Sequence, residues 1–295
     1  MTTTAVSPNI VAILGTGLMG SCAALRFANV GAKVRVWNRT VHRAVALVGD
    51  NVMLADTPAE AVRGADVVVA FLHDGPASLA VLLKLGAAVG SDARVYDMGT
   101  NTPCVAQKLA VALGAGFADA PVSGGITGLE AGTLRIFLGA TGARSDIAAR
   151  DLQALGCVTP MGCVGAGQAA KLANQVIVAG TIAALAEGLA LAGATGVDLR
   201  LLLTAMQGGF ADGHLLRLMG PRMATGDFAP RGRSSTHFKD LELAMAAAHG
   251  RLTLTATDAA KGHLARVLAL YGDLDHSAMF LSAALPPADP IERAD

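Results

Sequence analysis

A glycine-rich turn between a short apolar run and a helical pattern is the feature that most constrains this chain. Residues 10–14 are all apolar, the sequence GTGLMG follows at 15–20, and an apolar helical pattern begins directly afterwards. Strand, Gly-x-Gly-x-x-Gly and helix in this order bind a dinucleotide, because the glycines permit a tight turn and a close approach of backbone N–H groups to the pyrophosphate. A purely structural glycine turn is the alternative. The expected cofactor-binding residues of this loop are Gly15, Gly17, Leu18, Met19 and Gly20.

The next expected strand, residues 33–37, ends at Asn38, Arg39 and Thr40. In NAD-binding units an acidic residue near this position binds the ribose 2′-OH. Arg and Thr can instead hydrogen-bond a 2′-phosphate, which a carboxylate would repel. We therefore expect Asn38, Arg39 and Thr40 to bind the cofactor, with NADP(H) favoured over NAD(H). The alternative is that Arg39 is solvated, or stacks on the adenine of either cofactor.

Composition excludes several classes of function. Of the 295 residues, 53% are hydrophobic and 16% are charged, and the formal net charge is zero. Lys and Arg form no cluster, so we expect no nucleic-acid partner. The four cysteines have neither metal-ligand spacing nor a Cys-x-x-Cys motif, which indicates reduced thiols, no metal site and a cytoplasmic protein. Residues 1–9 lack the basic and apolar regions of a secretory signal peptide.

The stretch from residue 172 to residue 193 is almost wholly apolar and about as long as a bilayer is thick. Lys171 begins it, and Asn174, Gln175 and Glu187 interrupt it, so we expect no membrane span. A helix that is apolar all round is also typical of a completely buried helix. We therefore predict that the other domain and a second subunit cover this helix, and that the protein is a homodimer or tetramer.

Strand and helix patterns alternate up to about residue 164, which predicts a mostly parallel, doubly wound sheet. From Gly167 onward we find no convincing strand. The predicted fold class is α/β, a Rossmann doubly wound sheet followed by an all-helical C-terminal domain. We expect an NAD(P)-binding domain at 1–164 and a helical domain for substrate binding and dimerisation at 165–295. Further strands are expected at 67–71, 94–97, 116–119 and 134–138, and late helices at about 167–193, 198–207, 236–248 and 256–271.

The sequence DAPVSGG at 119–125 directly follows an expected strand. Ligands of open α/β sheets bind outside the carboxyl ends of the strands. We expect the Ser123 side chain and the N–H groups of Gly124 and Gly125 to hold a carboxylate or oxyanion of a small substrate. An ordinary glycine turn is the alternative.

Lys171, Asn174 and Gln175 are spaced i, i+3 and i+4, and so share one face of the long helix. A lysine in so apolar a helix is rarely buried without a role. The alternative is a cation at the helix start that faces water. Further along the chain, we expect Asp240 to favour the start of a helix and Lys239 to reach a phosphate or the nicotinamide edge.

Four sequences, GTGLMG, DAPVSGG, GAGQAAKLANQ at 165–175 and FKDL at 238–241, together resemble the β-hydroxyacid dehydrogenase family. This family includes 3-hydroxyisobutyrate dehydrogenase and tartronate semialdehyde reductase; KLANQ and the sequence DHSA at 275–278 look most like the latter. The resemblance implies that Lys171 is the general acid, that Gln175 or Asn174 orients substrate and lysine, and that Ser123, Gly124 and Gly125 hold the substrate carboxylate. It also implies that Lys239 lies over the cofactor. By the same likeness, the nicotinamide side is contacted by Leu72, His73 and Thr100.

Two departures from the family border the nicotinamide. The family commonly has Leu-Pro where this chain has Leu72-His73, and Ser-Ser or Ser-Thr where it has Gly99-Thr100. Neither change removes a catalytic group, but both positions border the nicotinamide, so we expect them to affect the choice of substrate. The arginines of the loop 231–235 either hold an acidic substrate or are solvated. We expect the segment 210–212 to project toward the substrate cleft. His276 is either a site residue or a polar residue of the tail.

The resemblance implies an NADPH-dependent oxidoreductase that transfers hydride between the nicotinamide and a short β-hydroxy acid or semialdehyde. An imine reductase is the close alternative, because its fold is very similar and VWNRT at 36–40 resembles that group too. Imine reductases typically lack a lysine at the position of Lys171, and DAPVSGG also weighs against them. A non-catalytic NADP-binding interaction module is the other alternative, and the presence of Lys171 argues against it.

Overall fold

The computed structural model describes residues 8–284 and divides the chain into two compact units, Met1–Leu172 and Ala173–Asp295. The expectation for residues 1–9 therefore lies almost wholly outside the described residues. The division falls inside helix α8 (Ala166–Ala194), while the sequence pattern places the domain boundary just before that helix.

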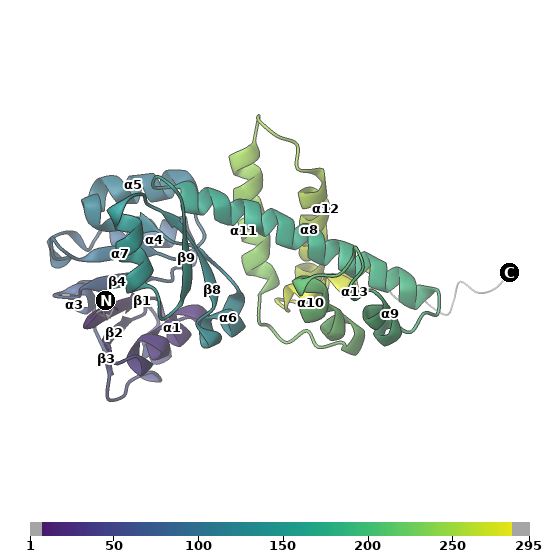
Figure 1. The fold of residues 1–295 in the computed structure, drawn as a ribbon, viewed down its shortest axis with the longest axis horizontal. Coiled ribbons are helices and arrows are strands. Elements are labelled where there is room, and N and C mark those ends of the chain that lie inside the picture. The colour runs from purple at the N-terminus through teal and green to yellow at the C-terminus, as the bar shows by residue number, and fades with distance from the viewer. Residues whose placement is uncertain (1–7, 285–295) are drawn as a thin grey trace. The chain divides into compact units, whose positions relative to one another are not determined.

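The first unit is built on a nine-stranded sheet (Figure 1). The strands lie in the order β3-β2-β1-β4-β5-β6-β8-β7, with β9 paired to β8. All pairs are parallel except β6–β8 and β7–β8. The strands are β1 (Ile10–Leu14), β2 (Lys33–Trp37), β3 (Val52–Leu54), β4 (Val67–Ala70), β5 (Arg94–Asp97), β6 (Phe117–Asp119), β7 (Val122–Ser123), β8 (Leu134–Gly139) and β9 (Gly156–Gly162).

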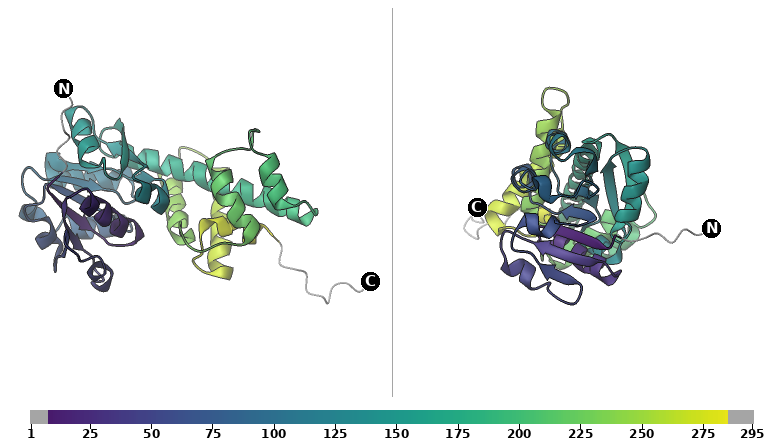
Figure 2. Two further views of the ribbon diagram at one scale, coloured as in Figure 1. Left: turned by 60° about the horizontal axis from the view of Figure 1, so that its bottom comes forward. Right: turned by 90° about the vertical axis from the view of Figure 1, so that its left-hand side faces the viewer.

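Helices cover both faces of this sheet (Figures 1 and 2). Along β1, Val11 and Ile13 belong to one apolar core, whereas Ala12 and Leu14 belong to the core on the opposite face. A strand buried on both faces is apolar throughout, which is why 10–14 is a continuous apolar run. The helices are α1 (Leu18–Asn29), α2 (His42–Val45), α3 (Pro58–Val62), α4 (Gly75–Leu82), α5 (Pro103–Leu113), α6 (Gly125–Ala131) and α7 (Ala143–Asp151), with 3₁₀ turns η1 (Gly86–Ala88) and η2 (Gly114–Gly116).

The order of the strands places the ligand-binding edge. The chain runs outward from β1 through β2 to β3, then returns to the other side of β1 to form β4. The topological switch point is therefore between β1 and β4, and ligands of doubly wound sheets bind outside the carboxyl ends of the strands at that point.

The second unit contains helices and no strand between residues 173 and 284. Its core is formed by residues such as Ile182, Leu241, Leu264 and Met279, all completely buried. Together with most of α8, the helices are α9 (Leu199–Ala205), α10 (His214–Thr225), α11 (Ser234–Ala248), α12 (Thr255–Tyr271) and α13 (Met279–Ala283), with a 3₁₀ turn η3 (His276–Ala278). The fold class predicted from the sequence is confirmed.

Within the single chain α8 is not completely covered, and its burial by a second subunit stays a prediction. Ile177 and Leu191 are each 67% exposed. Among the described residues, α8 is the one helix that is long and apolar enough to cross a membrane. Core helices of soluble proteins can have the same length and composition.

Candidate active site

The glycine loop between β1 and α1 has the geometry that a pyrophosphate needs. Gly15 has φ +94°, and a Cβ there would overlap the carbonyl oxygen of Phe71, while a Cβ on Gly20 would overlap that of Gly15. By contrast, no atom lies within 4 Å of the position that a Cβ on Gly17 would take. No side chain caps the first turn of α1, so its N–H groups can face an anion, as dinucleotide binding requires. The loop therefore fits a dinucleotide, and Leu18 and Met19 form the first turn beside it.

Asn38 is engaged by the protein backbone. Its Oδ1 accepts a hydrogen bond from the N–H of Thr16 at 3.0 Å, and its Nδ2 donates to the carbonyl of Thr40 at 2.9 Å. The side chain thus ties the glycine loop to the end of β2. Arg39 and Thr40 follow it and are exposed, so their side chains are the ones accessible to a 2′-phosphate.

Two further loops meet at the carboxyl ends of β4 and β5. Leu72 and His73 follow β4, and Gly99 and Thr100 follow β5. A Cβ on Gly99 would be 2.6 Å from the carbonyl oxygen of Leu72, so only glycine permits this approach. The structure therefore brings Leu72 and Thr100, both expected on the nicotinamide side, onto adjoining loops.

Lys171 lies in the second turn of α8 and is 8% exposed. The start of α8 is fixed by Asp119 at the end of β6. The carboxylate of Asp119 accepts hydrogen bonds from the N–H groups of Gly165 and Gln168, both at 2.8 Å. A negative charge at a helix N-terminus is favourable. The helix that carries Lys171 is therefore anchored to the carboxyl edge of the sheet.

A second buried carboxyl group lies beside this anchor. Asp97, at the end of β5, accepts hydrogen bonds from Ser78 Oγ, Gly99 N–H and Asn101 Nδ2. Burial raises the pKa of Asp97 to about 7; these hydrogen bonds act to lower it, and the charge of Asp119 adds to the increase. Burial also raises the pKa of Asp119, against the bonds from the helix N–H groups. The sequence motifs assign no role to Asp97, Asp119 or the buried Gln168; for the two aspartates, the available signal is a polar residue at the end of a strand.

The proposed substrate cradle begins at Ser123, the last residue of β7. Ser123 is half-buried and lies opposite Arg135 of β8 in the sheet register. Gly124 and Gly125 have φ of +123° and +62° and are exposed, which leaves their N–H groups without a covering side chain. This arrangement can accommodate a carboxylate.

In the second unit, Asp240 joins two of the predicted site residues. Its Oδ2 accepts a hydrogen bond from Gln175 Nε2 at 2.7 Å, and its Oδ1 lies 3.0 Å from Lys239 Nζ. Asn174 Nδ2 in turn donates to Gln175 Oε1 at 3.1 Å. Asn174, Gln175 and Lys239 therefore form one polar cluster around a buried carboxylate.

The prediction that Asp240 favours the start of its helix is wrong. Helix α11 begins at Ser234, after Arg233, and Asp240 lies in its interior. The apolar pattern of this helix begins only at Phe238, so the sequence suggests a start later than Ser234.

His276 is not a tail residue. It lies in η3, and its Nδ1 is 3.1 Å from Nδ1 of His237, whose Nε2 is 3.2 Å from the carbonyl oxygen of Gln175. The ring of His276 also lies close to Gly232, where a Cβ would be 2.9 Å from Cε1. His276 is thus packed against the cluster that contains Gln175.

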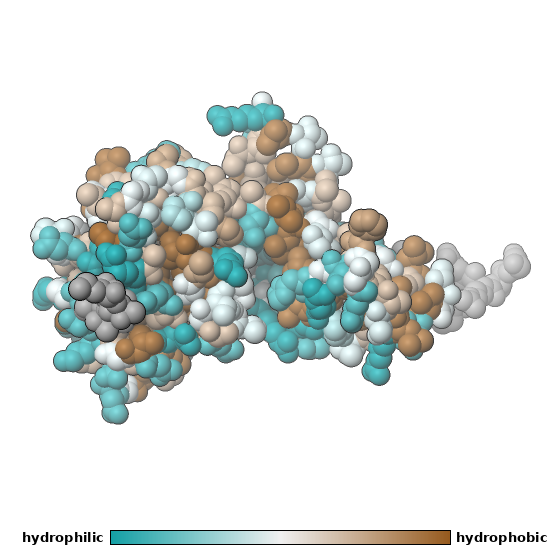
Figure 3. Space-filling view, viewed as in Figure 1, coloured by the Kyte–Doolittle hydropathy of each residue, from teal (hydrophilic) through white to brown (hydrophobic). Residues whose placement is uncertain are grey.

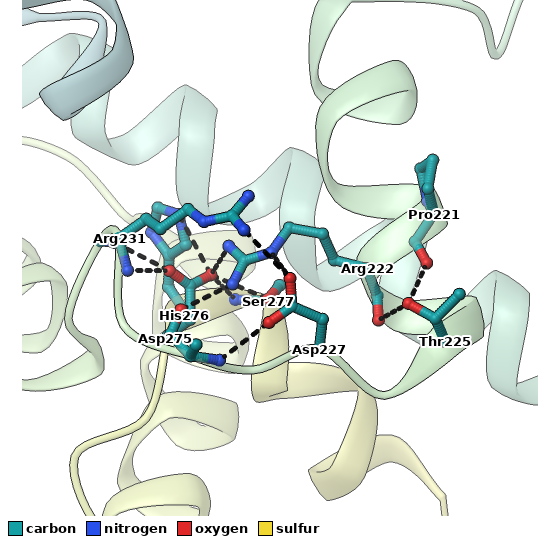
Figure 4. A network of polar contacts seen from close by, with 10 residues as sticks. Pro221, Arg222, Thr225, Asp227, Arg231, Asp275, His276 and Ser277 are labelled. Atoms are coloured by element: carbon teal, nitrogen blue, oxygen red, sulfur yellow. Dashed lines mark hydrogen bonds and ion pairs between the residues drawn. The ribbon is translucent and has the colours of Figure 1, made fainter. Parts of the chain in front are cut away.

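The arginines of the loop 231–235 are paired within their own unit. Arg231 Nη2 lies 3.2 Å from Asp227 Oδ2, and Arg233 Nη1 lies 3.0 Å from Asp273 Oδ2. The backbone N–H of Arg231 donates to the buried carboxylate of Asp275 (Figure 4). The structure therefore gives these arginines a role in holding the loop.

Phe210 lies at the surface of the second unit, completely exposed, between α9 and α10. The loop around it is held by Asp212, which accepts from the N–H groups of Gly208 and Gly213 and from the side chain of Arg217. Among residues 8–284, no group of side chains is arranged to hold a metal ion, and all four cysteines are free.

Comparisons with known proteins cover both units. The model of the NAD-binding domain of 6-phosphogluconate dehydrogenase matches residues 10–167, and that of the NAD-binding region of NADP-dependent 3-hydroxyisobutyrate dehydrogenase matches residues 165–282. The 2-hydroxy-3-oxopropionate reductase of Escherichia coli (strain K12) is 31% identical over 90% of this chain and 94% of its own length. A 3-hydroxyisobutyrate dehydrogenase structure from Mycobacterium tuberculosis, with L-serine, has a TM-score of 0.84 at 28% identity, covering 93% of this chain and 98% of that one.

The chain is a nicotinamide-dependent oxidoreductase, as its fold, its glycine loop and its similarity to known proteins together indicate. The chain belongs to the β-hydroxyacid dehydrogenase family, as its sequence motifs predict. An imine reductase from Pseudomonas sp. shares the fold, with a TM-score of 0.64 at 24% identity over 94% of this chain and 99% of that one.

Proposed function

We propose that the protein reduces a short semialdehyde or 3-oxo acid to the β-hydroxy acid with NADPH, and catalyses the reverse oxidation. Substrates of the tartronate semialdehyde or 3-hydroxyisobutyrate type fit this proposal, because the similar proteins carry the corresponding names. The observation that carries it is the position of Lys171. Lys171 is buried and lies on a helix whose start is bonded to the sheet edge at which dinucleotides bind.

The proposed roles follow from the contacts. When bound, the cofactor supplies or accepts hydride at the carbonyl carbon. In reduction, Lys171 donates a proton from Nζ to the carbonyl oxygen and stabilises the negative charge that develops there. Ser123 and the N–H groups of Gly124 and Gly125 hold the substrate carboxylate through charge-assisted hydrogen bonds. Gln175 and Asn174, oriented by Asp240, position the substrate, and Lys239 lies over the cofactor.

We also propose NADP(H) over NAD(H), because Arg39 and Thr40 are exposed beyond β2 and no carboxylate stands at position 38. Residues 165–295 are proposed to bind the substrate and to form the interface of a homodimer or tetramer. The free cysteines support a cytoplasmic location.

The test is a panel of substrates with the purified protein, followed by the loss of NADPH absorbance. We expect tartronate semialdehyde to be reduced at least about 100-fold faster, in kcat/KM, than propanal, since two charge-assisted hydrogen bonds are worth about 3 kcal/mol or more. Ser123→Ala should narrow that ratio, while Ser145→Ala, at a half-buried serine on α7, should not. Equal turnover of the acid and the neutral aldehyde would remove the proposed role of the cradle, and turnover of a cyclic imine instead would establish the imine reductase alternative.

A further inference from the structure

The side-chain amide of Gln168 bonds the backbone on both sides of Thr100. Its Nε2 donates to the carbonyl oxygen of Gly99, and its Oε1 accepts from the N–H of Asn101, both at 2.8 Å. Gln168 and Asn101 are completely buried. These two bonds, the Gln168 bridge, therefore fix the loop after β5 directly to α8.

Each end of the bridge is itself held. On the helix side, Asp119 accepts from the N–H of Gln168, and the carboxylate fills the space where side chains on Gly139 and Gly167 would lie. Only glycine is possible at these two positions without displacing Asp119.

On the loop side, the side chain of Asn101 continues the network. Its Nδ2 donates to Asp97 Oδ2 at 2.7 Å and to Ser78 Oγ at 3.2 Å. The N–H of Gly99 donates to Asp97 Oδ1 at 3.2 Å. The residues before and after Thr100 are therefore bonded both to the sheet and to α8.

Lys171 follows Gln168 by three residues in α8, about 4.5 Å along the helix axis and on the same side. We infer that Gln168 is a positioning residue that holds Thr100 and Lys171 in one rigid unit, so that the proton donor keeps a fixed place relative to the nicotinamide side of the cofactor site. This inference rests on the proposed function for its kinetic consequence, but the rigid unit itself can be measured without turnover.

The chemistry of the bridge restricts what can replace glutamine. The side chain must donate at one atom and accept at another. Methionine has similar length and can do neither, so Gln168→Met leaves a buried carbonyl and a buried N–H without partners. A glutamate can accept from Asn101 when ionised, but donates to Gly99 only when protonated. The ionisable groups around this position are Asp119, Asp97 and Lys171, and the two carboxyl groups together with burial favour the protonated glutamate.

The experiment compares Gln168→Met and Gln168→Glu with the wild-type enzyme. Misplacement of a catalytic group by about 1 Å costs on the order of 100-fold, so we expect Gln168→Met to lower kcat by about 10- to 100-fold, with KM and the dissociation constant of NADPH within about threefold. Gln168→Glu should resemble Gln168→Met at about pH 8, and its kcat relative to wild type should rise as the pH falls to about 6. A merely structural role would produce no such recovery.

Arg26→Met is the matched control. Arg26, on α1, also bonds distant backbone of the same unit, the carbonyls of Ala154 and Glu130. Arg26→Met should lower the stability of the protein but should not lower kcat. A kcat of Gln168→Met within about threefold of wild type, a pH-independent ratio for Gln168→Glu, or an equal fall in Arg26→Met would each overturn the inference.

Hydrogen exchange separates this inference from the proposed function. If the wild-type protein reduces none of the short semialdehydes or 3-oxo acids, the proposed function is wrong. The rigid unit is then tested by amide hydrogen exchange alone. Gln168→Met, but not Arg26→Met, should speed amide exchange in both residues 99–101 and residues 169–172. Unchanged protection in either segment would overturn the rigid unit.

Discussion

The guanidinium group of Arg222 lies 2.9 Å from Oδ1 of Asp275, and both side chains are buried, with 7% and 0% exposed (Figure 4). Asp275 also accepts from the N–H groups of Arg231, Gly232 and Ser277. Burial acts to raise the pKa of Asp275, but the neighbouring His276 and these N–H groups outweigh it and hold the pKa below its usual value. This pair therefore ties α10 to η3 and to the loop that carries Arg231.

Breaking the pair should destabilise the protein. Arg222→Met leaves the carboxylate buried without its cation, and removal of one partner of a buried pair costs about 3 kcal/mol or more. We expect this loss in the free energy of unfolding by urea at neutral pH. Arg217→Met is the control, because Arg217 pairs with Asp212 at the surface of the same helix and should barely move the unfolding midpoint. Similar losses in the two variants would contradict the importance of burial.

The raised pKa of Asp97 predicts that the free energy of unfolding depends on pH. Its pKa of about 7 in the folded protein, raised by burial, compares with 3.8 for an ordinary aspartate. The folded protein therefore keeps a proton that the unfolded chain loses at about pH 4. The resulting stability is complete below about pH 4, falls as the pH rises to about 7, and is absent above it.

We expect Asp97→Asn to abolish this dependence. The difference in unfolding free energy between wild type and variant should fall by about 4 kcal/mol between about pH 4 and about pH 7, at about 1.4 kcal/mol per pKa unit. Asp273→Asn is a control of opposite sign. Burial acts to raise the pKa of Asp273, but bonds from Ser235 and Arg233 outweigh it and lower the pKa, so its contribution is lost as the pH falls. If the difference in unfolding free energy between wild type and Asp97→Asn stays constant over this pH range, the carboxyl group of Asp97 is ionised in the folded protein throughout the range.

The predicted elements that the structure confirms rest on local patterns. The apolar run at 10–14, the glycines after it and the apolar helix after Lys171 can each be recognised within a short window. Strand β9 could not, because it contains Pro160, has glycine at both ends and pairs only with β8. Helix α10 contains Pro221, which normally ends a helix, and is held by packing of Leu216, Met219 and Met223 instead.

The buried network behind the site was missed for a different reason. Asp119 bonds N–H groups that are 46 and 49 residues away, and Gln168 bonds backbone groups 67 and 69 residues away. No spacing rule covers such distances, because only the topology of the sheet brings these segments together. Lys171, the proposed proton donor, can be recognised in the sequence as a cation in an apolar helix, whereas the residues that anchor the start of this helix cannot.

Self-association is the next prediction. Ile177, Leu191 and Leu201 are 67%, 67% and 69% exposed, and Figure 3 shows hydrophobic residues on the visible surface of the helical unit. Covering them would stabilise a dimer by about 25 cal/mol per Å² of apolar surface. We expect light scattering to give at least a dimer at micromolar concentration and Ile177→Glu to shift it toward monomer. Val111→Glu, at an 89% exposed valine on α5, should not, and a monomeric wild type would contradict the prediction.

We expect the preference for NADPH over NADH to depend on Arg39. Arg39→Ala should raise KM for NADPH by about tenfold or more, because a hydrogen bond to a charged group contributes about 1.5–3 kcal/mol, and should change KM for NADH much less. Lys33→Ala is the matched control. It removes the same charge at the amino end of the same strand and should leave the ratio of the two cofactors unchanged. Equal use of NADPH and NADH by the unmodified enzyme would contradict the proposed contact.

Lys171 carries the proposed chemistry and gives the decisive prediction. Lys171→Met keeps the approximate length and helix propensity of the side chain but removes the proton, so folding and NADPH binding should survive. Turnover should fall by about 10²- to 10⁴-fold, the usual contribution of a positioned acid. The measurement is the steady-state rate, beside NADPH affinity from fluorescence. Lys108→Met, an exposed lysine on α5, should keep the full rate. If Lys171→Met binds NADPH normally and works within about threefold of the wild-type rate, Lys171 is a structural cation and another group protonates the substrate.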